Sequence, residues 1–227
     1  SRYPCLFMSV ISNNQLAGAA GQGGADAGFK IDRSLRFNSG DSSYLSRTPS
    51  TAGNRKTWTW SGWVKRSQLG ILQTLMQLYP SGTGYTRIYF AAGDNLEFDA
   101  TDASGGNSAD VKTTRVFRDP SAWYHIVVAM DTTQATAANR LKMYVNGVQE
   151  TSMATATYPA QNVDYMFNYA GAHNIGRHSA NQQYLNGYLA EVHFLDGQAL
   201  AATDFGEFDD NNVWQPKEFT GSYLTTA

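Results

Sequence analysis

The segment Leu96 to Asp102, with the sequence LEFDATD, carries three carboxylates at a spacing that could support sugar chemistry. Glu97 and Asp99 are two residues apart, so on a β-strand their side chains point to the same face, and Asp102 follows three residues later. Retaining glycosidases use two carboxyl groups roughly 5 Å apart, one as nucleophile and one as acid/base. Same-face neighbours on a strand can supply that separation. The first functional hypothesis is therefore a glycoside hydrolase, provided that the surrounding elements position these side chains.

The composition of the chain favours one mostly β domain. Hydrophobic residues make up 42% of the 227 residues and charged residues only 16%, so the chain can bury a substantial core and lacks the signature of a disordered protein. The 21 glycines and 13 tyrosines, together with many Ser and Thr residues, favour strands and turns over helices. Since sandwiches of about 200 residues commonly form one unit, we expect an all-β fold in a single domain.

Charge and cysteine content exclude several classes of function. The formal net charge is −2 and basic residues cluster only in pairs, so no concentrated basic face for a nucleic acid is expected. Cys5 is the only cysteine, which excludes an internal disulfide and a cysteine-based zinc cluster. The apolar run CLFMSVI is too short for a membrane span and lacks a clear basic lead or cleavage site. We expect no transmembrane segment and no signal peptide.

Short alternating stretches from Ile31 onward predict the strands of a sandwich. In KTWTWSGWVKR, the set Trp58, Trp60, Gly62 and Val64 should face the core, and the residues between them the opposite side. SLRFNSGDSSYLSR predicts two short strands around a turn at 38–41. Further strands are expected at 71–79, 85–91, 95–100, 109–114, 123–130, 140–145 and 188–195, with one short helix at 199–205.

The pair Asn146-Gly147 predicts a tight hairpin between RLKMYV and VQETS. Both central positions of such a turn favour positive φ, which Asn and Gly tolerate.

The two ends of the chain differ from this strand-rich region. Residues 13–28 are rich in Gly and Ala with almost no large side chains, so they bury too little surface to offset the entropy of ordering. The last residues are polar, with Trp214, Phe219 and Tyr223 at irregular intervals. We expect an arm at 1–30 that is flexible or orders against a partner, a sandwich at 31–208, and an extended tail at 209–227 that wraps over the sandwich or docks elsewhere.

Four stretches carry a family resemblance: SLRFNSGDSSYLS, WTWSGWVKRS, AWYHIVVAMDTTQATAANRLKMYVNGVQ and HNIGRHSANQQYLNGYLAEVHFLDGQAL. In their order and spacing they resemble the laminin-G-like and pentraxin-like branch of the concanavalin A-like lectin/glucanase superfamily. The third is the most specific, with Trp123 and His125 on one strand and Tyr144, Asn146 and Gly147 at the hairpin. The resemblance runs from Ile31 to about Phe208 and implies a jelly-roll sandwich of two antiparallel sheets.

A second resemblance concerns where the protein works. RSLRFNSGDSSYLSRTPSTAGNRKTWTWSGWVKR and FGEFDDNNVWQPKEFTGSY are similar to segments of virion proteins of tailed phages, especially marine ones, that carry this domain. This resemblance implies a location in the virion.

The family comparison weakens the hydrolase hypothesis. Some glucanases of this superfamily carry Glu-x-Asp-x-x-Glu on one strand, whereas EFDATD ends in Asp102, whose side chain is one methylene shorter. A catalytic group must be placed within about half an ångström, so this shortening would displace an acid/base. The preceding residues AAGDN form a turn without an aromatic platform for a sugar. We therefore expect no enzyme activity, with Glu97 and Asp99 as solvated carboxylates on an exposed strand face.

The resemblance also implies a calcium site, because members of the superfamily often hold this ion with carboxylate and carbonyl oxygens. Asp41 and Glu191 match family positions near such a site. Ala190, however, stands where the family has Asp. The alternatives are that Asp41 stabilises the NSGD turn and that Glu191 is a paired or solvated strand residue.

Sugar binding is expected at one end of the sandwich, in the loops YPSGTGYT and GRHSANQQYLNG. Our candidate ligand residues are Tyr85, Arg177 and Tyr184, together with Trp63, which either stacks on a sugar or is covered by the tail. His125 lies among apolar neighbours and is expected to be structural.

Taken together, the residues and the two resemblances imply a non-enzymatic phage virion protein, either a capsid decoration or a fibre component. Its partners would be other virion proteins, contacted through 1–30 and 209–227, and further copies of itself, with host-surface glycans as a second ligand. A free-standing lectin would not need two extended termini. The alternatives are a stand-alone carbohydrate-binding module and a glucanase-like hydrolase.

Overall fold

The computed structural model describes residues 28–80, 82 and 84–223. The chain divides into the units Ser1–Lys30 and Ile31–Ala227. Most of the arm predicted at 1–30 lies outside the described residues, and the description below concerns the second unit. Within the described residues, no helix is long and apolar enough to cross a bilayer.

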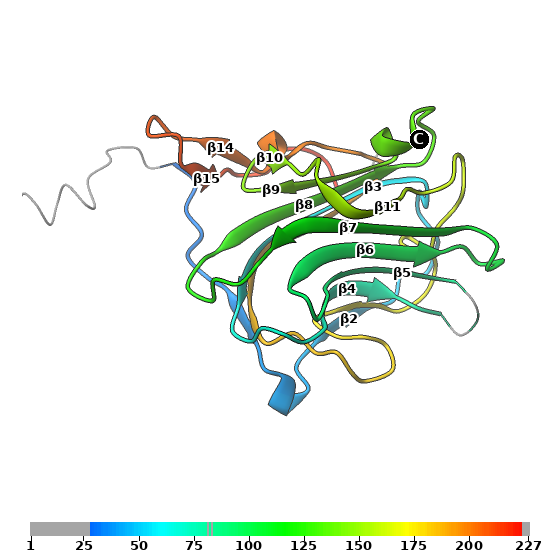
Figure 1. Ribbon diagram of the computed structural model, residues 1–227, viewed down its shortest axis with the longest axis horizontal. Helices are drawn as coiled ribbons and strands as arrows, with labels where there is room; N and C mark the ends of the chain where they lie inside the picture. The colour runs from blue at the N-terminus through cyan, green and yellow to red at the C-terminus, as the bar shows by residue number, and fades with distance from the viewer. Residues whose placement is uncertain (1–27, 81, 83, 224–227) are drawn as a thin grey trace, which may run out of the picture. The chain divides into compact units, whose positions relative to one another are not determined.

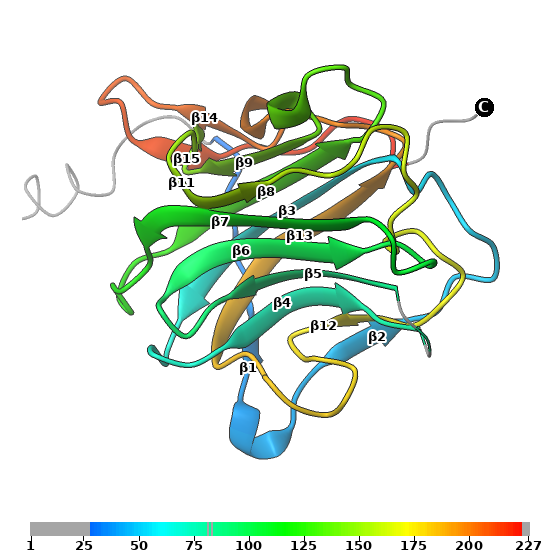
Figure 2. The same cartoon turned by 45° about the vertical axis from the view of Figure 1, so that its right-hand side comes forward.

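Two antiparallel sheets form this unit, which confirms the predicted all-β sandwich (Figure 1). The six-stranded sheet has the order β1 (Leu35–Phe37), β13 (Gly187–Asp196), β3 (Thr57–Arg66), β8 (Tyr124–Asp131), β9 (Leu141–Val145) and β10 (Val148–Gln149). The seven-stranded sheet has the order β11 (Met153–Thr157), β7 (Ser108–Val116), β6 (Asn95–Thr101), β5 (Tyr85–Phe90), β4 (Gln73–Leu78), β12 (His173–Ile175) and β2 (Leu45–Arg47). Figure 2 shows β7, β6, β5, β4, β12 and β2 side by side.

The main core lies between the sheets. Trp58, Trp60 and Val64 of β3 are fully buried there, as their alternation predicts. The Trp58 ring meets Phe98 of the seven-stranded sheet at 6.1 Å and Phe167 edge-on at 5.1 Å between centroids. Large aromatic side chains on alternate positions of one central strand therefore join the two sheets.

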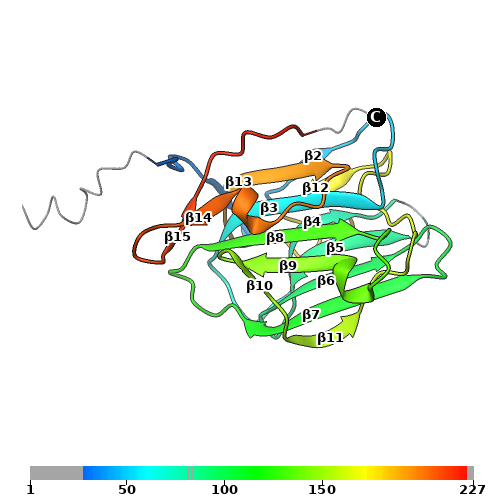
Figure 3. The same ribbon diagram turned by 90° about the horizontal axis from the view of Figure 1, so that it is seen from above.

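A second apolar cluster covers the other face of the six-stranded sheet. It consists of Val127, Leu195, Ala202, Phe205 and Trp214, with Trp63, Tyr144, Leu200 and Phe219 packed against it. The C-terminal segment supplies this cover through the strand pair β14 (Gly206–Phe208) and β15 (Trp214–Pro216). Figures 1 and 2 show this pair on the side of β8, β9 and β10, away from β4 to β7, and Figure 3 shows β13, β3, β8 and β9 side by side. The described part of the predicted tail therefore packs over the sandwich as far as Tyr223, whose backbone oxygen accepts a hydrogen bond from Asp196 N–H.

The hairpin at Asn146-Gly147 is confirmed, with φ values of 47° and 81°. Gly147 is required for a second reason, because a Cβ there would collide with the ring of Trp214. The turn of the hairpin thus forms part of the surface on which the C-terminal segment packs.

The two short strands expected around the turn at 38–41 are confirmed as β1 and β2. They belong to different sheets, so the 3₁₀ turn Ser39–Asp41 connects the two layers. The helix expected at 199–205 is only the 3₁₀ turn Ala202–Asp204. This turn positions Phe205 over the six-stranded sheet, and packing of that ring decides the local structure.

We predict that Trp214→Ala lowers the free energy of unfolding by about 3 kcal/mol, because truncating a buried tryptophan leaves a cavity. Trp214 is 8% exposed, whereas the adjacent Val213 is 53% exposed. Val213→Ala is therefore the matched control and should change stability by less than about 0.5 kcal/mol. Urea unfolding of both variants measures the difference, and equal stabilities would show that the C-terminal cover is not part of the folded core.

Candidate functional site

The outer face of the seven-stranded sheet carries a row of polar side chains that crosses all seven strands. In β5 and β6, Ile88, Phe90, Phe98 and Ala100 point into the core, so the residues between them point outward. Strand pairing then aligns Ser46, Asn174, Gln77, Arg87, Asp99, Asp110 and Thr157. Tyr89, Glu97 and Lys112 form a shorter parallel row.

Arg87 is the centre of this surface. Its guanidinium donates two hydrogen bonds to the Asp99 carboxylate, at 3.1 and 2.7 Å, and one to Gln183 Oε1 at 2.9 Å. It also lies over the Tyr89 ring, 3.8 Å from the centroid. Burial lowers the Arg87 pKa, but the Asp99 carboxylate outweighs this effect and the pKa is raised. A bidentate pair stacked on an aromatic ring holds the guanidinium in one orientation.

The expectation that Glu97 and Asp99 are solvated is wrong. They are only 6% and 9% exposed, and Glu97 forms an ion pair with Lys112 at 3.0 Å. The preceding AAGDN forms a turn as expected, but Tyr89 supplies an aromatic side chain as the cross-strand partner of Glu97. The burial of the carboxylates and this aromatic neighbour were both missed because cross-strand neighbours come from the pairing register, which the local sequence does not reveal.

Asp102 does not join the other two carboxylates. It lies in the turn after β6 and accepts hydrogen bonds from Ser104, Gly106 and Asn107. These bonds, led by the one from the Asn107 side chain, lower the Asp102 pKa to about 2. The third position of the motif therefore stabilises a turn.

The third carboxyl group on this face belongs to Asp110 and not to Asp102. It is the direct cross-strand partner of Asp99. Burial first, and then the charge of Glu97, raise the Asp110 pKa. Burial likewise raises the Asp99 pKa, against the opposing effect of Arg87. The face therefore combines two cations, Arg87 and Lys112, with several neighbouring carboxyl groups. Because these carboxyl groups lie close together, they resist being ionised at the same time.

The two loops predicted to bind sugar meet beside this surface. The rings of Tyr79 and Tyr85 from the first loop meet edge-on, with their centroids 6.3 Å apart. The centroid of the Tyr79 ring also lies 6.3 Å from that of His178 in the second loop. The second loop is anchored to the sheet, since Ser179 N–H donates to Gln77 Oε1 at 3.1 Å. We call Tyr79, Tyr85, Arg87, Tyr89, Asp99, His178 and Gln183 the outer-face site.

The predicted ligand residues separate into two groups. Tyr85 is part of the outer-face site, and Arg177 lies beside it, bonded to Asn174 and placed 3.3 Å from the centroid of the Tyr44 ring. Tyr184 is half-buried in the same loop. Trp63 lies on the other sheet, where it stacks on His125 at 5.0 Å and packs against the second apolar cluster. For Trp63 the alternative of a covered side chain is therefore the correct one.

The sequence reasoning missed Tyr79, Arg87, Tyr89 and Gln183. The sequence did carry a signal for Arg87 and Tyr89. In YTRIYF they alternate, together with Tyr85, with smaller or apolar residues, and this pattern predicts one polar and aromatic strand face. Tyr79 and Gln183 lie in the two loops that were expected to bind sugar, but which side chains of these loops reach the sheet depends on loop packing, for which the local sequence carries no signal.

Comparison with known proteins agrees with this architecture. The family model described as the concanavalin A-like lectin/glucanases superfamily matches residues 38–204. The chain belongs to this superfamily. A comparison with curated proteins gives no match.

Solved structures share the fold at low sequence identity. Domain 4 of AbnA, a GH43 extracellular arabinanase from Geobacillus stearothermophilus, in complex with arabinotriose, has a TM-score of 0.57 at 17% identity, over 78% of this chain and 76% of that one. A variant of the NanB sialidase from Streptococcus pneumoniae has a TM-score of 0.51 at 16% identity, over 81% of this chain but only 30% of the sialidase. A heptameric pentraxin from Limulus polyphemus is 15% identical with a TM-score of 0.47, over 77% and 76% of the two chains.

The calcium site that the superfamily implies gains no support from the predicted ligands. Asp41 is exposed in its 3₁₀ turn, where its carboxylate accepts a hydrogen bond from the Asn38 side chain at 2.6 Å. Glu191 lies at a bulge in β13, with φ of 46° and its carboxylate 3.4 Å from His193 Nε2. Across the part of the chain that the structure describes, no group of three or more His, Cys, Asp or Glu side chains could hold a metal ion. A calcium ion on Asp41 and Glu191 stays a prediction.

A buried serine and histidine form a pair that resembles a hydrolase dyad. Ser61 Oγ is 2.9 Å from His125 Nε2, and Trp214 Nε1–H donates to His125 Nδ1 at 3.1 Å. Because Nδ1 accepts that bond, the proton of the neutral ring lies on Nε2, which donates to the serine. His125 therefore cannot take the serine proton, and it acts as a structural link between β3, β8 and the C-terminal segment, as expected.

We predict that His125 makes stability depend on pH. Burial first, and then the charge of His193, lower the His125 pKa to about 3, from an ordinary value of 6.5. The folded state thus keeps the ring neutral while the unfolded chain binds a proton below about pH 6.5, so stability is complete above that pH and falls as pH drops toward 3. His125→Gln should reduce the slope by up to about 1.4 kcal/mol per pH unit between pH 4 and 6.

Urea unfolding at several pH values measures this slope. His178→Gln is the control and should change the slope less, because the His178 ring is only half-buried. His173, whose pKa burial lowers to about 4, and His193, whose pKa burial also lowers, should contribute to the slope that remains in the His125 variant. An unchanged slope in that variant would mean that His125 is already charged in the folded protein.

Proposed function

We propose that this chain is a non-catalytic glycan-binding module of a phage virion and that it binds through the outer-face site. The observation that carries the proposal is the meeting of two loops at one side of a polar sheet face, where they place tyrosine rings beside a fixed guanidinium. Tyr79 is 41% exposed, so its ring is available to a ligand.

The chemistry of this surface suits a sugar. Aromatic rings pack against the C–H faces of a pyranose, while its hydroxyl groups need donors and acceptors nearby. The outer-face site offers both kinds of group, since its Tyr rings adjoin Arg87, Asp99 and Gln183. Because these polar side chains are held by one another, binding orders few additional groups. The arabinanase domain, whose structure contains arabinotriose, supports the idea that this type of sandwich can hold a sugar chain.

The arrangement favours binding over hydrolysis. A retaining glycosidase needs one carboxylate free to attack the sugar and a second carboxyl group free to donate a proton. Here Asp99 is engaged by Arg87 and Glu97 by Lys112, and both are nearly inaccessible. The raised pKa values of Asp99 and Asp110 favour a hydrolase, and for this reason the binding experiment below includes a test for cleavage.

The virion role is supported by the phage-like segment FGEFDDNNVWQPKEFTGSY. This segment contains β14 and β15, which cover the six-stranded sheet through Trp214 and leave Phe208 and Val213 45% and 53% exposed. We propose that these exposed side chains and residues 1–30 contact neighbouring virion proteins or further copies of this chain. The glycan face lies on the other sheet and would stay accessible in such an assembly.

We predict saturable binding of the full chain to a subset of glycans on an array. Tyr79→Ala and Tyr85→Ala should each weaken binding about tenfold, since a lost ring contact costs about 1.4 kcal/mol. Tyr223→Ala, at a 48% exposed tyrosine that contacts His193, is the control and should bind normally.

Repeating the array with calcium and with a chelator tests the metal, and mass spectrometry of the eluted glycan tests for cleavage. A blank array with folded protein, or equal binding by all three tyrosine variants, would contradict the proposed site. Shortened glycan, lost again in Glu97→Gln, would establish a hydrolase instead.

The virion role predicts a separate result. A chain lacking residues 1–28 should show an unchanged thermal unfolding temperature but fail to enter phage particles, because the arm makes the proposed contacts. Quantitative mass spectrometry of purified particles measures incorporation against the full chain. Normal incorporation of the shortened chain would remove the arm from the assembly model.

A further inference from the structure

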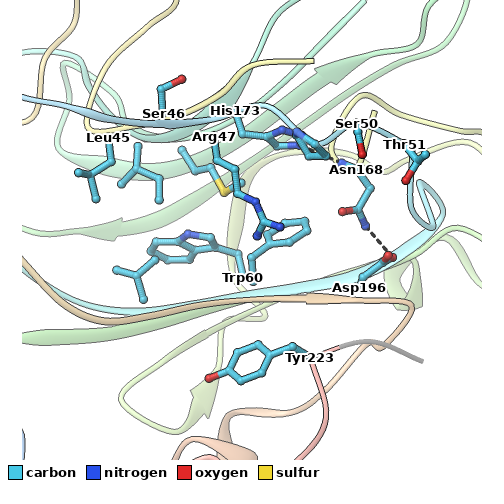
Figure 4. Close-up of a pocket in the computed structure, with 15 residues that line it drawn as sticks. Leu45, Ser46, Arg47, Ser50, Thr51, Trp60, Asn168, His173, Asp196 and Tyr223 are labelled. Carbon is cyan, nitrogen blue, oxygen red and sulfur yellow. Dashed lines mark hydrogen bonds between the residues drawn. The ribbon is translucent and has the colours of Figure 1, made fainter. Parts of the chain in front are cut away.

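A cleft of about 770 Å³ opens between the two sheets on the side of β12 and β13. His173 and Ile175 of β12 line one wall, and Val192 and Phe194 of β13 line the other. A second hollow of about 420 Å³ shares some of these residues and extends the space toward β1. We call this space the edge cleft (Figure 4). Its volume lies within the range of ligand pockets in proteins, roughly 300–1,000 Å³.

The walls of the edge cleft are mainly apolar. Besides Ile175, Val192 and Phe194, they include Leu45 and Met76. Leu45 is 46% exposed although its side chain is aliphatic. A space lined mainly by aliphatic and aromatic side chains favours a hydrocarbon chain over a polyhydroxylated sugar.

Two hydrogen-bond donors at the edge cleft have no acceptor among the described residues. The indole Nε1 of Trp60 is fully buried and unpaired, and Trp60 lines the cleft. The Arg47 side chain points from β2 into the cleft (Figure 4), and within the described residues it makes no ion pair or side-chain hydrogen bond. An unpaired buried donor is unfavourable, and a cation beside apolar walls attracts an anion.

Two acceptors that line the cleft are already engaged. Asp196 Oδ1 accepts hydrogen bonds from Asn54 N–H at 2.7 Å and from Asn168 Nδ2 at 2.9 Å. His173 Nε2 accepts from Asn168 N–H at 3.1 Å, so its other ring nitrogen carries the proton, which it donates to Gly171 O. The Arg47 guanidinium is therefore the charged donor that the cleft offers to a ligand, and the Asp196 carboxylate favours an anionic group at Arg47 over one at its own position.

We infer that the edge cleft binds a single-chain amphiphile with an anionic head group. The hydrocarbon chain lies between the sheets against Ile175, Val192 and Phe194, and the head group pairs with the Arg47 guanidinium. A long-chain fatty acid is the simplest compound of this kind. This site is separate from the outer-face site and does not depend on glycan binding.

Isothermal titration of the full chain with dodecanoate, below its micelle concentration, tests the inference. Dodecanoate should bind saturably with one molecule per chain. Hexanoate, with the same head and a shorter chain, should bind at least about tenfold more weakly, and so should dodecyltrimethylammonium, which has the same chain and a cationic head. Absence of saturable dodecanoate binding, or equal binding of the anionic and cationic amphiphiles, would overturn the inference.

Variants locate the head group. Arg47→Glu should lose at least about tenfold in dodecanoate affinity, and Arg47→Lys should retain part of it. Arg36→Glu, at an exposed position on β1, and Tyr79→Ala, in the outer-face site, should bind dodecanoate normally. Arg47 is exposed, so its variants should fold, and their unfolding temperatures check this. Unchanged dodecanoate binding by Arg47→Glu would contradict the proposed head-group position.

Discussion

The structure depends on the burial of both faces of the six-stranded sheet. One face of β3 presents Trp58 and Trp60 to the seven-stranded sheet, and the other presents Thr59 and Ser61, which are also fully buried. A sheet of this kind needs a second cover, and the C-terminal segment provides it through Phe205 and Trp214. The polar groups beneath that cover are satisfied locally, since Thr59 Oγ1 donates to Gln198 O and His125 bridges Ser61 and Trp214.

Because of this cover, the outer faces of the two sheets differ in character. The outer side of the six-stranded sheet is a second core, whereas the outer side of the seven-stranded sheet carries charged and aromatic side chains. The charges there are balanced mainly by one another, as in the Arg87–Asp99 and Lys112–Glu97 pairs. Because each of these side chains is held by its ion-pair partner, the surface is rigid. A rigid surface loses little entropy when a ligand of matching shape binds, whereas acid/base catalysis needs carboxyl groups that are free to exchange protons.

Much of the fold could be predicted from the sequence, because strand periodicity and turn chemistry are local. Trp58 and Trp60 reveal the core face of β3 through their spacing, and Asn146-Gly147 reveals its hairpin through backbone preference. The site could be predicted only in part. Tyr85 was found from its loop, but the environment of Glu97 and Asp99 depends on Arg87, Tyr89 and Lys112, which reach them across strands. Register and loop docking are properties of the whole fold, and a local pattern does not contain them.

The edges of the two large sheets limit how one copy of the chain could pair with another. Among the described residues, three of the four edge strands of these two sheets are very short, since β1 and β2 have three residues each and β10 has two. Such edges expose too few backbone N–H and C=O groups to template a strand from a neighbouring molecule. Crowded copies would therefore resist cross-β aggregation, and their contacts would be left to side chains.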